Sequence, residues 1–190
     1  MTKHNKTFVT VLLLFVLVAG LTVALRPLIR LTPAVHIDYQ DTVFRYAKEY
    51  SLEPALVFAV IKTESNFDPL ARSDKNAYGL MQITESTLNW ALFREGKGLN
   101  YTAADLYEPK INIKYGCFLL SLLLEEFGDT DTALAAYNAG RSNVLKWLKD
   151  SRYSPDGKRI TDAPYEETAR YIEKVRKNQE KYQQMLGENQ

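Results

Sequence analysis

The hydrophobic pattern divides the chain into an uncharged N-terminal run and a longer part with helical periodicity. Residues 8–25, FVTVLLLFVLVAGLTVAL, carry no charge. As a helix they would span roughly 27 Å, close to the hydrocarbon thickness of a bilayer. Such a run is typical of a cleaved signal peptide or of a retained anchor. It is longer than a usual signal-peptide core, and neither an A-x-A motif nor a lipid-accepting cysteine follows it, so we expect a single transmembrane anchor over residues 1–30.

From about residue 38 the apolar positions recur with the period of a helix, and no strand-like alternation persists. A first amphipathic helix is predicted by four residues spaced i, i+3, i+4 and i+7: Val43, Tyr46, Ala47 and Tyr50. Pro54 then stands at the start of a second helix, where its missing N–H is harmless. This second helix, ALVFAVIKTES, is apolar on most sides. We expect it to be the central buried helix, with Glu64 at its C-terminal end.

Further helices are predicted over about residues 84–93, 109–127 and 132–138, around 144–148, and from Pro164 onward. Asp131 is the expected N-cap of the third of these, and Gly128 the expected left-handed C-cap of the long helix before it. Thr102 and Asp105 predict a short capped turn. Residues 66–78 and 151–163 are predicted loops. The expected architecture is a compact all-α domain over residues 37–182, with seven to nine helices.

Charge and the scarcity of cysteine and histidine exclude several classes of protein. The first 25 residues hold two of the 24 Lys and Arg and none of the 23 acidic residues, so the rest has a net charge of −1 and no basic signature for nucleic acid. The single cysteine, Cys117, lies in an apolar run and is expected to be a small buried hydrophobe. The two histidines, His4 and His36, lie in or beside the N-terminal segment. This distribution argues against a cysteine nucleophile, a Ser-His-Asp triad and a His/Cys zinc site.

Four short strings occur in order along the helical part. ESNFDPLARS begins at Glu64 and GLMQ at Gly79, AAYNAG covers residues 135–140, and PYEET begins at Pro164 and is followed by Tyr171. Between them, DLYEP at 105–109 and the pair Asn112-Ile113 also look familial. In this order the strings resemble the signature of the soluble lytic transglycosylase family over about residues 37–180. The resemblance implies a lysozyme-like helical fold.

The resemblance also implies a substrate and a mechanism. The substrate would be the glycan strands of peptidoglycan, Glu64 the catalytic acid and base, and no metal or organic cofactor would be needed. Glu64 would protonate the oxygen between N-acetylmuramic acid and N-acetylglucosamine. It would then act as base for the C6 hydroxyl of the muramic acid, which attacks C1 and gives a 1,6-anhydro sugar. The substrate's own N-acetyl group would stabilise the cationic intermediate, leaving the protein to position and polarise it.

The residues around Glu64 are consistent with an acid of this kind. Glycosidic cleavage needs a carboxylic acid that keeps its proton near neutral pH, and burial beside apolar surface favours that state. Glu64 follows an apolar helix and precedes an irregular loop that carries Phe67. The alternative for Glu64, judged without the motif, is a solvated glutamate at a helix end.

The resemblance carries a substrate-binding role onto eight further positions: Ser73, Gly79, Met81, Gln82, Tyr137, Asn138, Tyr165 and Glu167. Several have a structural alternative. Ser73 either contacts the sugar and orients the glutamate or caps its own loop, and Met81 either lines the groove or packs at a helix start. Gly79 would allow a close approach of the chain, and Tyr137 would lie near the catalytic glutamate.

Three departures from the family pattern affect these assignments. Asn76 replaces a glycine, a tolerable change because asparagine adopts positive φ more readily than most residues. Glu85 replaces a proline and adds a charge near the expected cleft. Ala169 follows Thr168 where the family often has arginine, which weakens the assignment of Glu167.

Two other functions fit the same sequence. A muramidase of the same fold would hydrolyse the bond and leave a reducing end, and a non-catalytic glycan-binding or assembly module would not cleave it. The charges that flank the apolar run nearly balance, so the positive-inside rule says little about orientation. The implied activity places the catalytic domain on the extracytoplasmic, wall-facing side of a bacterial cell membrane. The sequence identifies no protein partner.

Overall fold

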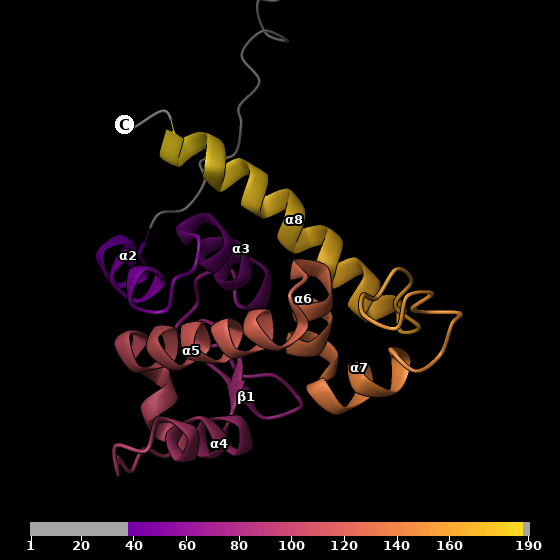
Figure 1. The fold of residues 1–190 in the computed structure, drawn as a ribbon. Helices are drawn as coiled ribbons and strands as arrows, with labels where there is room; N and C mark the ends of the chain where they lie inside the picture. The colour runs from indigo at the N-terminus through magenta and orange to yellow at the C-terminus, as the bar shows by residue number, and fades with distance from the viewer. Residues whose placement is uncertain (1–37, 188–190) are drawn as a thin grey trace, which may run out of the picture. The chain divides into compact units, whose positions relative to one another are not determined.

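Residues 38–187 are described by a computed structural model, and the predicted anchor over residues 1–30 lies outside them. They form seven α-helices, one 3-10 helix and one short hairpin (Figure 1). In chain order these are α2 (Gln40–Glu49), α3 (Pro54–Glu64), β1 (Ala77–Tyr78), β2 (Ile83–Thr84), α4 (Glu85–Glu95), η1 (Ala103–Tyr107), α5 (Pro109–Phe127), α6 (Thr130–Ala139), α7 (Arg141–Trp147) and α8 (Glu166–Gly187). None of the helices in this described part is long and apolar enough to cross a membrane.

Helix α3 is the centre of the core, as predicted. Its residues 55–61 are all buried, with exposed fractions of 4% or less. The C-terminal helix α8 makes the most extensive helix contact with α3 and also packs on α6 (Figure 1). The ring of Phe58 in α3 stacks on Tyr182 in α8, with centroids 5.2 Å apart. Because burying a large apolar side chain contributes about 1.5–3 kcal/mol, this helix pair supplies much of the stability of the fold.

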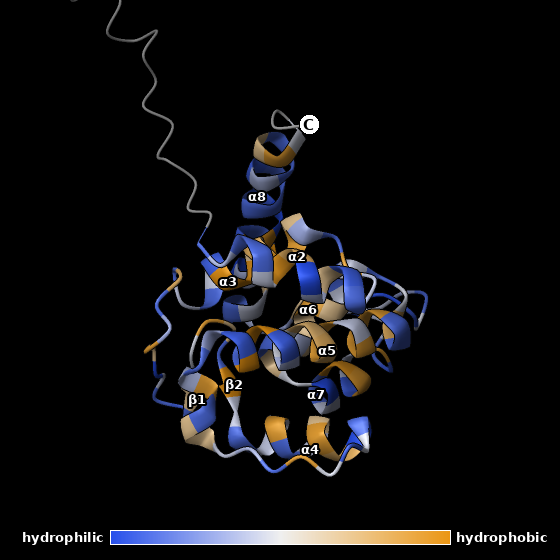
Figure 2. Cartoon of the chain, turned by 90° about the vertical axis from the view of Figure 1, so that its left-hand side faces the viewer, coloured by the Kyte–Doolittle hydropathy of each residue, from blue (hydrophilic) through white to orange (hydrophobic). Residues whose placement is uncertain are grey.

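Helix α5 packs mainly against α6 and α2 and, on its other side, against α4 (Figure 1). Hydrophobic and hydrophilic residues alternate around α4 and α5, which is the pattern of helices covered on one side (Figure 2). Cys117 of α5 is fully buried, as predicted for a small hydrophobe. Gly128 ends α5 in the left-handed conformation, with φ 65°, which confirms the predicted C-cap.

Two predicted helix starts were wrong by two residues. The N-cap of α6 is Asp129 instead of Asp131, because its Oδ2 accepts hydrogen bonds from the backbone N–H and the hydroxyl of Thr132, at 2.9 and 2.6 Å. Asp131 instead pairs with Arg176 of α8, at 3.2 Å. The last helix begins at Glu166 and not at Pro164.

The hairpin is the one departure from an all-helical description of residues 38–187. Ala77 pairs with Thr84 and Tyr78 with Ile83 in antiparallel register. Strands of two residues are too short for a period-2 pattern to show in the sequence, which is why this segment was expected to be loop. The capped turn was predicted correctly: the backbone N–H of Thr102 donates to Asp105 at 2.7 Å, at the start of η1.

Candidate functional site

Glu64 is the last residue of α3, where the buried helix reaches the surface. Its side chain is partly buried, and the loss of hydration raises its pKa from 4.5 to about 7. The negative charge of Glu167 raises this pKa further, while the hydroxyl of Tyr171 lowers it. Because the charged form of a desolvated carboxyl is disfavoured, Glu64 keeps its proton for a large part of the time near neutral pH. It can therefore act both as a proton donor and as a base.

Two tyrosine hydroxyls, one from α6 and one from α8, lie close enough to this carboxyl for its charge to affect them. Burial and the negative charge of Glu64 raise the pKa of both Tyr137 and Tyr171 well above the usual value, so both hydroxyls stay protonated. The hydroxyl of Tyr137 donates to the backbone oxygen of Met81 at 2.8 Å. The buried hydroxyl of Tyr171 makes no hydrogen bond of regular geometry with the described residues. Since its interaction with Glu64 lowers the pKa of that carboxyl, Tyr171 stabilises the ionised form.

Tyr171 received no role from the sequence, although it was noted as part of the fourth string. It lies one turn after Thr168, and both side chains are buried on the same face of α8. The helical spacing of these two residues is the signal that could have placed Tyr171 beside the carboxyl of Glu64.

The loop after α3 turns sharply and brings the GLMQ segment against the end of the helix. Asn66 and Phe67 both adopt the left-handed conformation, with φ 54° and 68°, which reverses the chain directly after Glu64. Phe67 is buried, and its ring lies 6.4 Å from that of Phe58. The hydroxyl of Ser65 donates to the backbone oxygen of Leu80 at 2.8 Å. The GLMQ segment is thereby held beside the end of the helix that carries Glu64.

Asn112 of α5 supports the same segment from the other side. Its Oδ1 accepts from the backbone N–H of Met81 at 2.8 Å, and its Nδ2 donates to the backbone oxygens of Tyr78 and Leu106 at 2.8 and 2.7 Å. Gly79 is required for this approach, because a Cβ there would lie 2.3 Å from the oxygen of Leu106 and 2.4 Å from Nδ2 of Asn112. The familial Asn112 is thus a fully buried bridge between α5, the hairpin and η1.

Three predicted contact residues are engaged in holding the loop. The hydroxyl of Ser73 accepts from the backbone N–H of Ala77 at 3.1 Å, the pattern of a loop-capping serine. The amide of Gln82 donates to the backbone oxygen of Gly79 at 3.0 Å. Met81 is fully buried. A direct contact of these residues with a sugar stays a prediction.

The remaining predicted residues lie along α6 and at the start of α8. Oδ1 of Asn138 accepts from the hydroxyl of Thr168 at 2.8 Å and joins the two helices. Tyr165 is half exposed, and its ring lies edge-on to Trp147 at 4.9 Å. Glu167 is exposed and forms an ion pair at 3.4 Å with Lys75 of the loop after α3. Glu167 thus lies at the rim of the site, while Asn138 holds α8 in place.

Two of the departures from the family pattern have a structural place. Asn76 adopts φ 55°, which confirms that asparagine takes the positive φ expected of the glycine it replaces. Glu85 is the first residue of α4, whose N-cap Thr84 accepts from the backbone N–H of Thr87 at 3.2 Å. A negative charge is favourable at a helix N-terminus, so Glu85 stabilises the start of α4.

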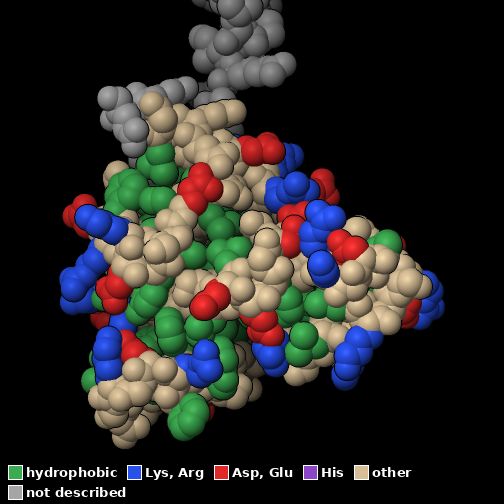
Figure 3. Space-filling view, viewed as in Figure 1, with side chains coloured by type: hydrophobic (Ala, Val, Ile, Leu, Met, Phe, Trp, Pro, Cys, Tyr) green, Lys and Arg blue, Asp and Glu red, His purple; other side chains and the backbone are tan. Residues whose placement is uncertain are grey.

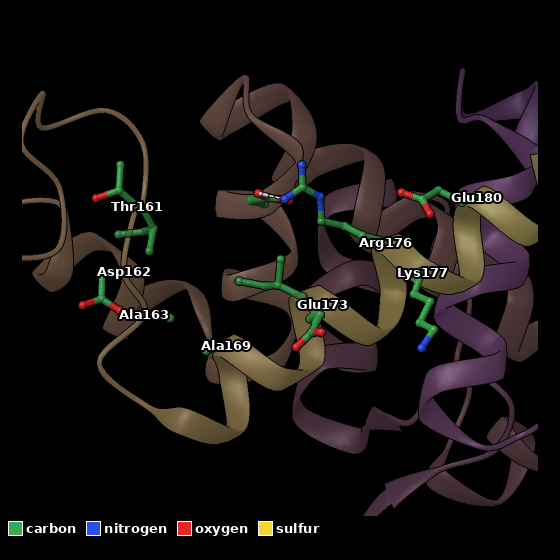
Figure 4. A pocket seen from close by; sticks show the side chains of 11 residues that line it. Thr161, Asp162, Ala163, Ala169, Glu173, Arg176, Lys177 and Glu180 are labelled. Atoms are coloured by element: carbon green, nitrogen blue, oxygen red, sulfur yellow. Dashed lines mark ion pairs between the residues drawn. The ribbon is translucent and has the colours of Figure 1, made fainter.

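A groove of about 360 Å³ adjoins this site and includes Tyr137. A second hollow, of about 430 Å³, lies on the face of α8 opposite Tyr171 and contains the ion pair of Arg176 with Asp131 (Figure 4). Glu64 lines neither of them. On the face drawn in Figure 3, acidic and basic side chains are interspersed without a continuous basic surface. Within residues 38–187, no three His, Cys, Asp or Glu side chains cluster as metal ligands would.

The fold and site define a lysozyme-like helical domain with a partly buried carboxylic acid near two buried tyrosine hydroxyls. The family model described as "Transglycosylase SLT domain" matches residues 41–160. The chain therefore belongs to this family. The soluble lytic transglycosylase of Escherichia coli has the same fold, with a TM-score of 0.71, 26% identity and 80% of this chain covered. An inactive mutant of the lytic transglycosylase Slt from Pseudomonas aeruginosa matches with a TM-score of 0.69 and 32% identity over the same share.

Among curated proteins, the membrane-bound lytic murein transglycosylase C of Actinobacillus pleuropneumoniae is 34% identical over 166 residues. That alignment covers 76% of this chain and 46% of the relative. The chain thus spans about half the length of the curated relative, and the matched part of each solved structure is 25% of that longer chain.

Proposed function

We propose that this protein is a peptidoglycan lytic transglycosylase, which cleaves the β-1,4 bond between N-acetylmuramic acid and N-acetylglucosamine and forms 1,6-anhydro ends. The observation that carries the proposal is the partly buried carboxyl of Glu64 at the end of a buried helix, where burial raises its pKa to about 7. Such an acid donates its proton to the glycosidic oxygen and then takes up the proton of the C6 hydroxyl. The hydroxyl of Tyr171 stabilises the carboxylate between the two steps. The names of the relatives agree with this activity.

We propose that the eight other predicted residues surround the bound glycan strand and have two kinds of role. Gly79, Met81, Gln82 and Ser73 shape and hold the segment beside Glu64. Tyr137 bonds to this segment through its hydroxyl and lines the adjoining groove. The exposed rim would contact the strand directly through three residues of α6 and the start of α8: Asn138, Tyr165 and Glu167.

The alternative function is that of a muramidase, and the electrostatic interaction of Glu167 with Glu64 is the observation that supports it. A hydrolase that inverts or retains configuration uses a second carboxylate, and the charge of Glu167 acts on Glu64. Glu167, however, is exposed and paired with Lys75. These surroundings favour a role at the rim over that of a second catalytic group.

The reaction products separate these two enzymes. Purified sacculi would be digested and the released muropeptides weighed by mass spectrometry. An anhydro product is lighter than the hydrolytic product by one water. We expect anhydro products from the native chain, a loss of about 10³-fold or more in Glu64→Gln, and anhydro products still formed by Glu167→Gln. Glu173→Gln, on the far face of α8, is the matched control and should be as active as the native chain. Reducing ends as the main product would establish the muramidase instead, and cleavage by Glu64→Gln at the native rate would contradict the role of Glu64.

We propose that residues 1–30 anchor the protein in the cell membrane by a single pass, and that residues 37–182 form the catalytic domain on the wall-facing side. The uncharged run at 8–25 supports the anchor, as does the name of the membrane-bound relative. A chain lacking residues 1–30 should move from the membrane fraction to the soluble fraction, while the full chain resists extraction at high salt. Protease added to spheroplasts should digest the domain, and full protection would contradict the orientation.

A further inference from the structure

The groove beside the catalytic site carries an exposed tryptophan that the proposed reaction does not use. Its floor is formed by Leu119 and Leu123 of α5, one wall by α4 with Trp90, and the other wall by the corner between α6 and α7 with Tyr137 and Arg141. Its volume of about 360 Å³ is within the range of small-molecule sites. An apolar floor with a few polar groups around it is the usual composition of such sites.

Tyr137 connects this groove to the catalytic glutamate. Its hydroxyl lies where the charge of Glu64 raises its pKa, and donates to Met81 beside the catalytic centre. The same side chain lines the groove. A polymer bound at Glu64 that passes along the ring of Tyr137 therefore enters the groove.

Trp90 lines the groove and is 40% exposed. The guanidinium of Arg94 lies over its ring, 5.8 Å from the centroid. Arg94 and Trp90 also line an adjoining hollow, and Arg94 does not line the groove. The cation–π contact of Arg94 therefore lies on the side of the adjoining hollow, while Trp90 is also exposed to the groove.

Polar groups surround the indole at the edges of the groove. Ser86 and Thr87 lie one turn before Trp90 on the same wall, and Ser142 lies on the opposite wall. Arg141 is held at that rim by Glu126, with Nε donating to the two carboxylate oxygens at 2.9 and 2.6 Å. An aromatic face beside fixed donors and hydroxyls is complementary to a pyranose ring, which has apolar C–H faces and a polar rim.

We propose that Trp90 forms a further sugar subsite, in which an N-acetylhexosamine unit of the bound strand, away from the bond that is cleaved, stacks on the indole. The inference rests on the proposed function, since the occupant is another unit of the same glycan. The subsite makes binding depend on the length of the strand. Long strands reach Trp90 and short ones do not.

Binding by an inactive variant tests the subsite without turnover. Calorimetry on the full chain carrying Glu64→Gln would compare β-1,4-linked N-acetylglucosamine oligomers from dimer to hexamer. We expect the hexamer to bind about tenfold more tightly than the dimer. Adding Trp90→Ala should remove this gain and leave dimer binding unchanged, whereas Trp90→Phe should keep most of the gain. Phe93→Ala is the matched control, because Phe93 is an exposed aromatic residue of the same helix, 84% exposed, that does not line the groove.

A second measurement does not depend on a mutant that folds correctly. The chain contains two tryptophans, Trp90 and the buried Trp147. In NMR spectra the indole N–H resonance of Trp90 should shift with the hexamer and not with the dimer, and that of Trp147 should stay in place. The absence of any gain with length, an unshifted Trp90 resonance, or an equal loss for dimer and hexamer in Trp90→Ala would each overturn the subsite.

The outcomes separate the subsite from the reaction. If sacculi yield anhydro products while Trp90→Ala binds the hexamer normally, the proposed function stands and the subsite fails. If the native chain releases no anhydro product but Trp90→Ala loses the gain with length, the reaction fails and the groove stands as a glycan-binding site.

Discussion

The protonation of Glu64 connects activity and stability at the scale of a single residue. The general acid must be protonated in the free enzyme, and the pKa of Glu64 is about 7. We therefore expect kcat/KM to fall about tenfold per pH unit above this value, measured as muropeptide release. Glu167→Gln removes a charge that raises this pKa, so the alkaline limb should move to lower pH. Glu173→Gln, on the opposite face of α8, should leave it in place. A profile that is flat between about pH 6 and 9 would contradict the assignment of Glu64 as the general acid.

The same pKa predicts how stability depends on pH. The carboxyl binds its proton more tightly in the folded chain, with pKa about 7, than at its model value of 4.5. Its contribution to stability is fully present below pH 4.5 and is lost as the pH rises through 7. Glu64→Gln should thus be more stable than the native chain at alkaline pH, by about 2–3 kcal/mol. At about pH 4 it should be no more stable than the native chain. Urea unfolding at the two pH values measures the difference.

Asn112 offers a second prediction at this scale. Asn112→Ala leaves the N–H of Met81 and the oxygens of Tyr78 and Leu106 without their buried partner. A buried unpaired group costs about 1–3 kcal/mol, so we expect a loss of about 3–5 kcal/mol in the free energy of unfolding. Asn143→Ala removes a single bond to Ala139 at a partly buried position and should cost about 1 kcal/mol or less. Equal effects of the two substitutions would show that Asn112 is not a structural bridge.

Single residues also show which information the sequence carries. The burial of Cys117 and the positive φ of Asn76 follow from side-chain chemistry and were predicted. The bridging role of Asn112 and the position of Tyr171 beside Glu64 depend on contacts between segments distant in the chain. No local pattern contains such contacts, and only the familial strings drew attention to these two residues.

At the scale of elements, helix α5 contacts the GLMQ segment through Gly116, which lies against Met81. A Cβ on Gly116 would lie 2.2 Å from Sδ and 2.8 Å from Cβ of Met81. Alanine is the better helix former, yet Gly116→Ala forces Met81 and its segment away from α5. We expect a loss of about 1–3 kcal/mol in stability, together with reduced release of muropeptides.

A double-mutant cycle with Met81→Ala is the control for that contact. The shorter side chain makes room, so the double variant should be more stable than the sum of the two single effects implies. If the two losses of stability are additive, the effect of Gly116→Ala does not come from its contact with Met81.

Elements differ in how well their sequences reveal them. The apolar run of α3 and the glycine at the end of α5 determine those helices locally, and both were predicted. The start of α6 was misplaced because Asp129 and Asp131 are both good caps, and the choice depends on Arg176 of α8, which binds Asp131. The hairpin was missed because strands of two residues show no alternating pattern, and part of its support comes from Asn112, which is distant in sequence.

At the scale of the whole molecule, the match to the family model ends before the last helix of the folded domain begins. The match stops at residue 160, whereas α8 begins at Glu166 and covers α3. We expect a chain ending at residue 164 to lose cooperative unfolding and NMR dispersion, because the buried side chains of Tyr171, Val175 and Tyr182 are removed from the core. Replacing the exposed Lys174 and Lys181 by alanine should leave both intact. A folded, cooperative truncated chain would show that α8 is an accessory.

The position of α8 in the chain also determines when the centre can form. Asn178 of α8 bonds to Thr63, next to Glu64, across a separation of 115 positions in sequence. Synthesis proceeds from the N-terminus, so a nascent chain displays Glu64 long before the helix that carries Tyr171 leaves the ribosome. Contacts between residues so far apart in sequence form slowly during folding. The surroundings of Glu64 are therefore incomplete until α8 has been synthesised, and a shorter nascent chain contains Glu64 without Tyr171 beside it.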